Sequence, residues 1–288
     1  MIELWLFFAV GTILCYATAQ QFSKKGVLIL GSYQTGILYT SASVIIQTTY
    51  WLLLPDNVQG DLLGYLTAVI AGVIGALGFV FYIFALRIGK VSVVSVMTAG
   101  YPVISIILAL LFLSESLTLI QGFAIMMVIG AMILLSAPES SEGNRKEGTN
   151  RMKRWLFWAI MSMIFWGLWA IPSKIAIEAI GEADYIFIDG LTMVLVWVPL
   201  WLWFEKGKLM RGFHNLKYSG FAGVMASIGT ICLFLAISNG NVSIVTPVTS
   251  IYPLMTVVLA RFTLKEKLVR WQYLAVLIGV SGIALLAM

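Results

Sequence analysis

One stretch of this chain occurs twice, and it constrains the fold more than any other feature. Residues 85–135 lie over residues 236–286 without a gap after a shift of 151 positions, with seventeen identities. Shared apolarity would match Leu and Val by chance, but it would not match the following pairs: Gly89/Gly240, Ser92/Ser243, Thr98/Thr249, Tyr101/Tyr252, Pro102/Pro253, Glu115/Glu266 and Gln121/Gln272. The chain is therefore predicted to be two copies of one unit, with its function where the copies meet.

The composition assigns this repeated unit to a membrane. The chain has 288 residues, of which 60% are hydrophobic and 11% are charged, whereas about a quarter of the residues in a soluble domain are charged. We therefore predict an all-α integral membrane protein whose surroundings are the lipid bilayer. The net charge of +5 does not indicate nucleic-acid binding, because the basic residues lie in short segments between apolar runs.

The apolar runs predict ten transmembrane helices, since a span needs about 20 apolar residues. Residues 1–136 form the first five-helix repeat, 137–154 a polar linker and 155–288 the second repeat. Because five is odd, the second repeat enters the membrane from the opposite side, and such inverted repeats are typical of secondary transporters. The predicted helices are 3–22, 33–54, 62–86, 91–112, 117–136, 155–176, 185–204, 216–237, 242–263 and 269–287.

The distribution of Lys and Arg predicts the orientation of these helices. Seventeen basic residues lie in the linker and in the loops on its side, and only Lys174 lies on the other side. Since cytoplasmic loops carry the excess of basic residues, we place the linker in the cytoplasm and both termini outside a cell membrane that the chain crosses many times.

The repeated motifs resemble a known family. Each copy has a Tyr-Pro pair in its fourth helix, an L-x-E-x-L turn and a following Gln, and Phe165–Lys174 reads FWGLWAIPSK. These features resemble the EamA-type branch of the drug/metabolite transporter superfamily. The resemblance implies a carrier of amino acids, sugars, other metabolites or drugs, often an exporter. Many ten-helix members are thought to keep both termini in the cytoplasm, and the charge-based orientation departs from that.

We predict a secondary transporter that works by alternating access, with amino acid or related metabolite export as the leading function. A sugar porter or a drug exporter of the same superfamily is the alternative, and a channel or membrane scaffold is the alternative outside this class. An enzyme is disfavoured, because the one histidine, His214, lies in a basic loop and no nucleophile–base set is present. No cofactor and no metal site are predicted. One chain is sufficient to form the cavity, so a monomer is sufficient for this function, and a dimer is the alternative.

Two prolines mark the predicted cavity. Pro102 and Pro253 lie near the centres of their helices, where each proline frees the carbonyl four residues earlier. The freed carbonyls belong to the matched threonines. We predict a polar ring at mid-depth made of Thr98, Tyr101, Thr249 and Tyr252. The alternative is that these positions are kinks packed between helices.

Two charged residues within the spans are further candidates, because such residues are costly in a membrane and often functional. Lys174, just after the third hinge candidate Pro172, could attract a carboxylate or phosphate, and Lys24 is its match in the first copy. The alternative for Lys174 is a snorkelling lysine at the interface. Asp189 has no match and is the candidate for proton coupling, with protons as the coupling ion, or for pairing with Lys174. Its alternative is an interfacial acid.

The remaining candidates are uncharged. Gln20 and Gln47 either face the cavity or bond between helices, and Trp166 and Trp169 either line an apolar pocket or belong to packing and the aromatic belt. The glycines of residues 72–78 lie on one helix face and predict close helix packing. The matched acids Glu115 and Glu266 are interpreted as caps of the helices that follow them.

Overall fold

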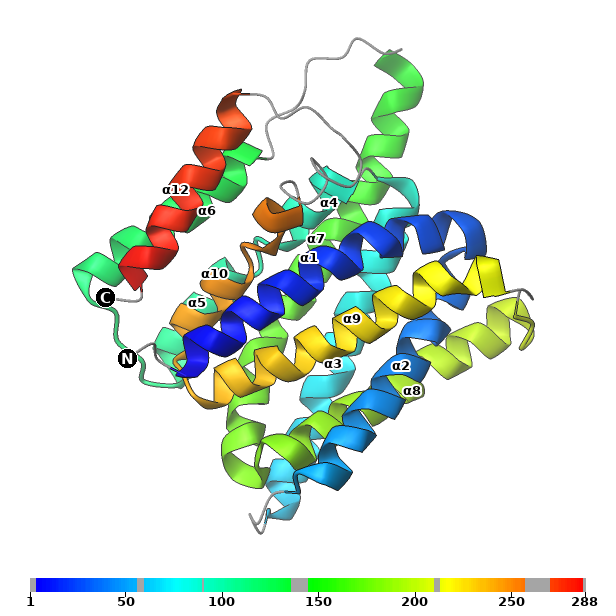
Figure 1. The fold of residues 1–288 in the computed structure, drawn as a ribbon, viewed down its shortest axis with the longest axis horizontal. Coiled ribbons are helices and arrows are strands. Elements are labelled where there is room, and N and C mark those ends of the chain that lie inside the picture. Colours follow the sequence, from blue (N-terminus) through cyan, green and yellow to red (C-terminus); the bar gives the residue numbers. More distant parts are fainter. Residues whose placement is uncertain are drawn as a thin grey trace.

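The computed structural model describes residues 4–55, 60–89, 91–135, 145–209, 213–256 and 270–286, and its elements in these ranges are helices. Figure 1 shows their arrangement. The helices are α1 (Leu4–Leu30), α2 (Ser32–Leu53), α3 (Leu62–Ile88), α4 (Val91–Thr98), α5 (Pro102–Phe112), α6 (Leu119–Leu135), α7 (Arg145–Ile180), α8 (Glu182–Glu205), α9 (Phe213–Ser238), α10 (Val242–Thr249) and α12 (Arg270–Leu286).

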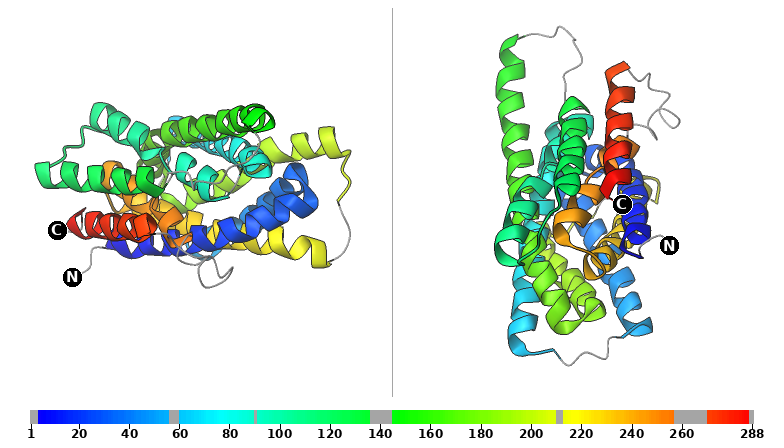
Figure 2. Two further views of the ribbon diagram at one scale, coloured as in Figure 1. Left: turned by 90° about the horizontal axis from the view of Figure 1, so that it is seen from above. Right: turned by 90° about the vertical axis from the view of Figure 1, so that its left-hand side faces the viewer.

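The main helix contacts join the first half of the chain to the second. In Figure 1, α1 packs along α9, and α2 along α8, while α3 packs along α7. Helices α6 and α12 lie side by side at the edge of the bundle (Figure 2). The partners run antiparallel: Gly36 on α2 is next to Trp197 on α8, and Trp51 near the other end of α2 contacts Asp184 at the start of α8.

Glycines on α3 let α7 approach closely, as their spacing predicted. A Cβ at Gly75 would lie 2.8 Å from Cδ1 of Trp169, and a Cβ at Gly78 would lie 2.6 Å from Cδ1 of Trp166. Neither distance is tolerated by a packed side chain, so only glycine fits at these positions. The two glycines therefore set the position of two indoles that were candidates for the site.

The predicted helix 91–112 is divided in two, which corrects the prediction of a kinked continuous helix. Helix α4 ends at Thr98 and α5 begins at Pro102. The Thr98 carbonyl accepts a hydrogen bond from the Tyr101 N–H at 3.2 Å, so a tight turn takes up the carbonyl that was predicted to be free. In the second half, α10 ends at Thr249 and residues 252–256 are helical again, while the rest of predicted helix 242–263 lies outside the described residues.

Helices α1 and α7 are longer than predicted. Lys24 and Glu178, which lie beyond the ends of the predicted helices 3–22 and 155–176, are helical, and residues 145–154 of the predicted linker are the first turns of α7. Lys24 Nζ donates to the carbonyl oxygens of Leu86 and Gly89 at 2.6 and 2.7 Å, at the C-terminus of α3. A cation there satisfies carbonyls that have no partner within the helix and interacts favourably with the helix dipole.

Glu115 does cap a helix, but not the helix that was predicted. Its two carboxylate oxygens accept hydrogen bonds from the Val242 and Ser243 N–H groups, each at 2.9 Å, at the start of α10 in the other half. Helix α6, which follows Glu115, is capped instead by Thr118 and Gln121, which bond reciprocally to each other's N–H groups. The matched residue Glu266 lies outside the described residues.

Five helical segments of the described residues are long and apolar enough to cross a membrane: Leu4–Leu30, Leu62–Ile88, Arg154–Ile180, Glu182–Glu205 and Leu216–Ser238. Three shorter apolar segments lie around the helix breaks and in α6. The predicted number of ten spans stays a prediction. The many exposed apolar side chains, such as Leu111 and Leu119, are what a bilayer would cover.

Candidate functional site

A cavity of about 150 Å³ lies midway along the helices, between the two halves. Both halves contribute to its wall, and so do both helix breaks, through Tyr101 and Tyr252. The lining residues are Tyr16, Ala19, Gln20, Ser23, Tyr39, Ser43, Gly75, Ala76, Phe79, Tyr82, Tyr101, Trp166, Trp169, Asp189, Met193, Ala226, Thr230, Leu233, Phe234 and Tyr252.

Nine of the twenty residues that line this wall are aromatic. The Trp166 ring lies against Tyr82 with centroids 5.4 Å apart and against Tyr101 at 6.4 Å. Elsewhere in the wall, Tyr16 meets Tyr252 edge to face with centroids 5.8 Å apart. The rings hold one another in place, because edge-to-face and tilted pairs are favourable beyond the area they bury.

Asp189 is the one charged residue among the described residues that line the cavity. Gln47 Nε2 on the neighbouring α2 donates to Asp189 Oδ2 at 3.1 Å. Gln47 itself is 1% exposed and lies behind the wall, next to Gly190, where a Cβ would lie 2.6 Å from its Oε1. The amide thus orients the carboxylate from outside the cavity.

Short hydrogen-bond networks hold the other polar groups of the wall. Gln20 Oε1 accepts from Ser95 Oγ at 2.5 Å, and the Tyr16 hydroxyl bonds with the Thr230 hydroxyl at 3.0 Å. The Tyr82 hydroxyl is buried and has no hydrogen-bond partner in the part of the chain that the structure describes. A polar group in this position favours a ligand or water that can bond to it.

Six of the predicted cavity residues line the cavity: Gln20, Tyr101, Trp166, Trp169, Asp189 and Tyr252. Thr98 and Thr249 do not, since both hydroxyls donate to carbonyls of the preceding turn, and Tyr101 Oη lies 3.4 Å from Thr249 Oγ1. Of the three hinge candidates, Pro102 begins α5, Pro253 follows the second break and Pro172 lies inside α7.

The structure does not bring Lys174 to the cavity or to Asp189. Its Nζ donates to the carbonyl oxygens of Ile237 and Ser238 at 2.9 and 3.4 Å, at the C-terminus of α9, and lies 3.3 Å from Glu178 Oε1. This position corresponds to that of Lys24 at the end of α3. The pairing of Lys174 with Asp189 is therefore wrong.

Comparison with known proteins gives the family. Two segments of the chain, residues 3–137 and 153–288, match the model of the EamA-like transporter family. The chain belongs to the EamA-like transporter family. The family model thus matches this chain twice, once in each half.

Two further comparisons agree with this assignment. A solved crystal structure superimposes on this EamA-like chain with a TM-score of 0.79, covering 99% of this chain and 98% of that one at 13% identity, which shows the fold alone. An uncharacterized protein of Methanocaldococcus jannaschii is 28% identical over 128 residues, which make up 92% of that protein and 44% of this chain. That relative is therefore about as long as one repeat.

Sequence reasoning missed several cavity residues of this EamA-like chain. Tyr39, Phe79, Tyr82 and Phe234 all line the wall but lie in helices whose apolar runs hide them. Tyr16 could have been found, because it lies 150 positions before Trp166 and the two copies align with nearly this offset.

Proposed function

We propose that this EamA-like protein is a secondary transporter that moves small metabolites across a membrane by alternating access. The cavity between the two halves carries this proposal. It lies midway along the helices and is lined at both helix breaks, where substrate sites of transporters with discontinuous helices are found. Membership of this family favours transport over catalysis.

The arrangement of the halves supports two inverted five-helix repeats. Helices α2 and α8 correspond to each other in the two copies, and they pack antiparallel. Helix α1, the first helix of its copy, packs on α9, the third helix of the other copy. In the same way α7, the first helix of the second copy, packs on α3, the third helix of the first copy. Parallel repeats would place corresponding helices in the same direction.

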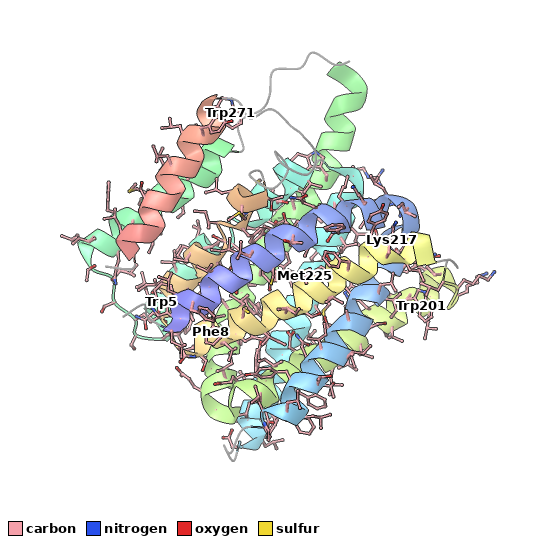
Figure 3. All side chains as sticks on the ribbon, in the orientation of Figure 1. Trp5, Phe8, Trp201, Lys217, Met225 and Trp271 are labelled. Atoms are coloured by element: carbon pink, nitrogen blue, oxygen red, sulfur yellow. The ribbon has the colours of Figure 1, made fainter. Side chains whose placement is uncertain are left out.

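Charge supports the proposed orientation. Lys217 and Trp201 lie at one end of the bundle, and Trp5 and Phe8 at the other (Figure 3). Lys25, which is 5.6 Å from the Tyr218 ring centroid, lies at the same end as Lys217. We propose that this end faces the cytoplasm of a cell membrane and that the termini face outward.

The substrate proposed from the sequence is an amino acid or a related metabolite, moved outward. Asp189 would receive the amine and is also where protons would couple to transport. The apolar rings and neutral hydroxyls keep a sugar or a drug as alternatives. The cavity is contained in one chain, so a monomer suffices for this function.

Counterflow in proteoliposomes tests the carrier. Vesicles are preloaded with unlabelled amino acids, sugars or an organic cation in separate batches, and uptake of the labelled compound is followed. A carrier gives saturable uptake that the trapped compound accelerates, because outward transport of the trapped compound brings the binding site back to the outer side. A channel gives uptake that neither saturates nor responds to the trapped compound, and that result would refute the proposal.

A further inference from the structure

We propose that an anionic phospholipid binds in a recess at the basic end of the bundle, with its phosphate held by Arg87 and Arg154. The recess has a volume of about 940 Å³ and lies between α2, α3, α7 and α8. None of its lining residues lines the central cavity. The lining residues are Tyr33, Phe84, Arg87, Ile88, Arg154, Trp158, Leu200 and Phe204.

The charge of this recess is positive. Arg87 and Arg154 are its two formal charges, and no acid is among the described lining residues. Both arginines are exposed, and neither has an ion pair or a hydrogen bond with another described residue. The acid at this end of α8, Glu205, is not in the lining and accepts a hydrogen bond from Gln34 Nε2 at 3.4 Å. Two guanidinium groups in one recess suit a phosphate, whose oxygens accept paired hydrogen bonds from such planar groups.

The packing of α3 on α7 fixes how the two arginines lie relative to each other. A Cβ at Gly89 would lie 3.3 Å from Trp155 Cγ. A Cβ at Gly78 would lie 2.6 Å from Trp166 Cδ1. Eleven residues back along α3 therefore correspond to eleven residues forward along α7, so the two helices run antiparallel in one register.

This register places both arginines at the depth of lipid headgroups. Arg87 is level with residue 157, three residues from Arg154, and three residues span about 4.5 Å of helix. The apolar segments Leu62–Ile88 and Arg154–Ile180 have 27 residues each and end at or next to these arginines. A helix of this length spans about 40 Å, which covers the hydrocarbon and the headgroup regions of a bilayer. The phosphate of a lipid in this leaflet is therefore within reach of both side chains.

Four aromatic rings, one from each helix, form the apolar side of the recess. The Phe204 ring stacks on Tyr33 with centroids 4.6 Å apart and an angle of 7° between the planes. Tyr33 meets Phe84 at 5.6 Å, and Phe84 meets Trp158 at 5.4 Å. Aromatic rings at this depth are typical of the membrane interface, where they lie against lipid. They favour a phospholipid over a free phosphate ion, which gains nothing from apolar rings.

The surroundings of the recess favour an acidic lipid over a neutral one. Lys217 and Trp201 mark this end in Figure 3, and it is the end proposed to face the cytoplasm. Basic clusters next to a span attract the acidic lipids of the cytoplasmic leaflet, and basic pockets between transmembrane helices bind their headgroups. The first turns of α7, before Arg154, contain one acid, Glu147, and four further basic residues: Arg145, Lys146, Arg151 and Lys153.

A lipid in this recess would contact both halves of the chain. Tyr33 and Arg87 belong to the first half, and Arg154 and Phe204 to the second. A ligand that binds only the folded protein stabilises it. Binding across the two halves also favours the arrangement in which these four helix ends meet. The lipid should therefore raise the unfolding temperature of the protein in detergent.

Titration of lipid into the purified full chain, in a neutral detergent, tests the proposal without a transport measurement. Phosphatidylglycerol is the anionic probe, phosphatidylcholine with the same acyl chains is the zwitterionic one, and glycerol phosphate supplies the anion without chains. Native mass spectrometry counts the bound lipids. We expect one phosphatidylglycerol to bind at least tenfold more tightly than phosphatidylcholine. At a hundredfold excess over its dissociation constant it should raise the unfolding temperature by about 5 °C or more, and glycerol phosphate should not.

Variants of the recess assign the binding to the two arginines. Arg87→Gln and Arg154→Gln should each weaken phosphatidylglycerol binding by roughly tenfold, because each removes a charged hydrogen-bond donor. The double variant should lose the preference over phosphatidylcholine. Arg87→Lys keeps the charge without the planar group and should fall between. The matched control is Lys208→Gln, which removes an exposed cation outside the lining and should leave the preference unchanged.

The outcomes separate this proposal from the transport function. Equal binding of the two lipids, or an unchanged preference in the double glutamine variant, would overturn it. An equal loss in Lys208→Gln would also overturn it, because the overall charge of this end would then hold the lipid. Displacement of phosphatidylglycerol by glycerol phosphate would assign the recess to a soluble phosphate compound instead. None of these results depends on counterflow, so the proposed transport function would stand in each case.

Discussion

Removal of the Glu115 carboxylate should release the start of α10 and lower the stability of the whole bundle. Its two oxygens each accept an N–H at 2.9 Å, from Val242 and Ser243, and so connect the α5–α6 loop to the other half of the chain. A hydrogen bond to a charged group contributes about 1.5–3 kcal/mol, and loss of a helix cap costs about 0.5–2 kcal/mol. Glu115 is only half-buried, so we expect Glu115→Ala to cost about 2 kcal/mol.

Two measurements check this magnitude. At about 2–4 °C per kcal/mol for a chain of this order of size, Glu115→Ala should lower the thermal unfolding temperature in detergent by about 4–8 °C. Hydrogen exchange should accelerate by about 30-fold at the Val242 and Ser243 amides, because 1.4 kcal/mol is a factor of ten. Glu115→Gln keeps one acceptor oxygen and should fall about midway.

The matched control is Glu178→Ala. Its carboxylate is 60% exposed and pairs with Lys174 across one helical turn, and such pairs contribute about 0.5 kcal/mol or less. Its unfolding temperature should change by no more than about 2 °C, with no change in exchange at α10. Equal effects of Glu115→Ala and Glu178→Ala, or unchanged exchange at Val242 in Glu115→Ala, would show that the cap does not stabilise α10.

Five other variants test the frame around the cavity. Gly78→Ala places a methyl group 2.6 Å from Trp166 and should cost about 1–3 kcal/mol in thermal unfolding, whereas Gly130→Ala, with nothing within 4 Å, should stabilise α6 slightly. Tyr65→Phe removes the 2.5 Å bond from the hydroxyl to Asp184 and should lower stability by about 1–2 kcal/mol while leaving counterflow saturable. Lys174→Met and Lys24→Met should each lower the unfolding temperature, because each lysine binds carbonyl oxygens at the end of a helix. Lys174→Met should leave the order of counterflow substrates unchanged, because Lys174 does not line the cavity.

The repeat made much of the architecture predictable. Matching of polar residues in register indicated two units, and the family model matches the chain in two segments close to those boundaries. The glycine spacing on α3 also identified a helix contact, because close approach leaves no room for a Cβ. Helix ends were less predictable: α1 continues through Lys24 to Leu30, since the lysine finds carbonyl partners within the protein rather than solvent.

Tertiary contacts explain the errors at the site. Pro102 predicted a disturbed helix, but whether the chain kinks or breaks depends on the turn that receives the Thr98 carbonyl. Lys174 looked like a substrate ligand because a lysine in a span is costly, and the sequence does not show the end of α9 next to it. Tyr39 and Phe234 gave no signal because an aromatic residue in an apolar helix has the same pattern whether it faces lipid, core or cavity.

Some residues have a counterpart in the other copy and some have none, and this difference bears on how one site serves the inward-facing and the outward-facing states. Lys24 and Lys174 bind carbonyls at matched positions of α3 and α9 and so belong to the frame, whereas the matched Tyr101 and Tyr252 both line the cavity. Asp189 has no acidic match, since the offset of 150 positions that relates Lys24 to Lys174 and Gly31 to Gly181 places Tyr39 at that position of the first copy. In alternating access by inverted repeats, each repeat adopts the conformation that the other had before. A contact that has a counterpart in the other repeat is then replaced by that counterpart, but the Asp189 carboxylate has no acidic counterpart. A single Asp189 must then meet the substrate from both sides of the membrane, so Asp189→Asn should impair binding from either side equally.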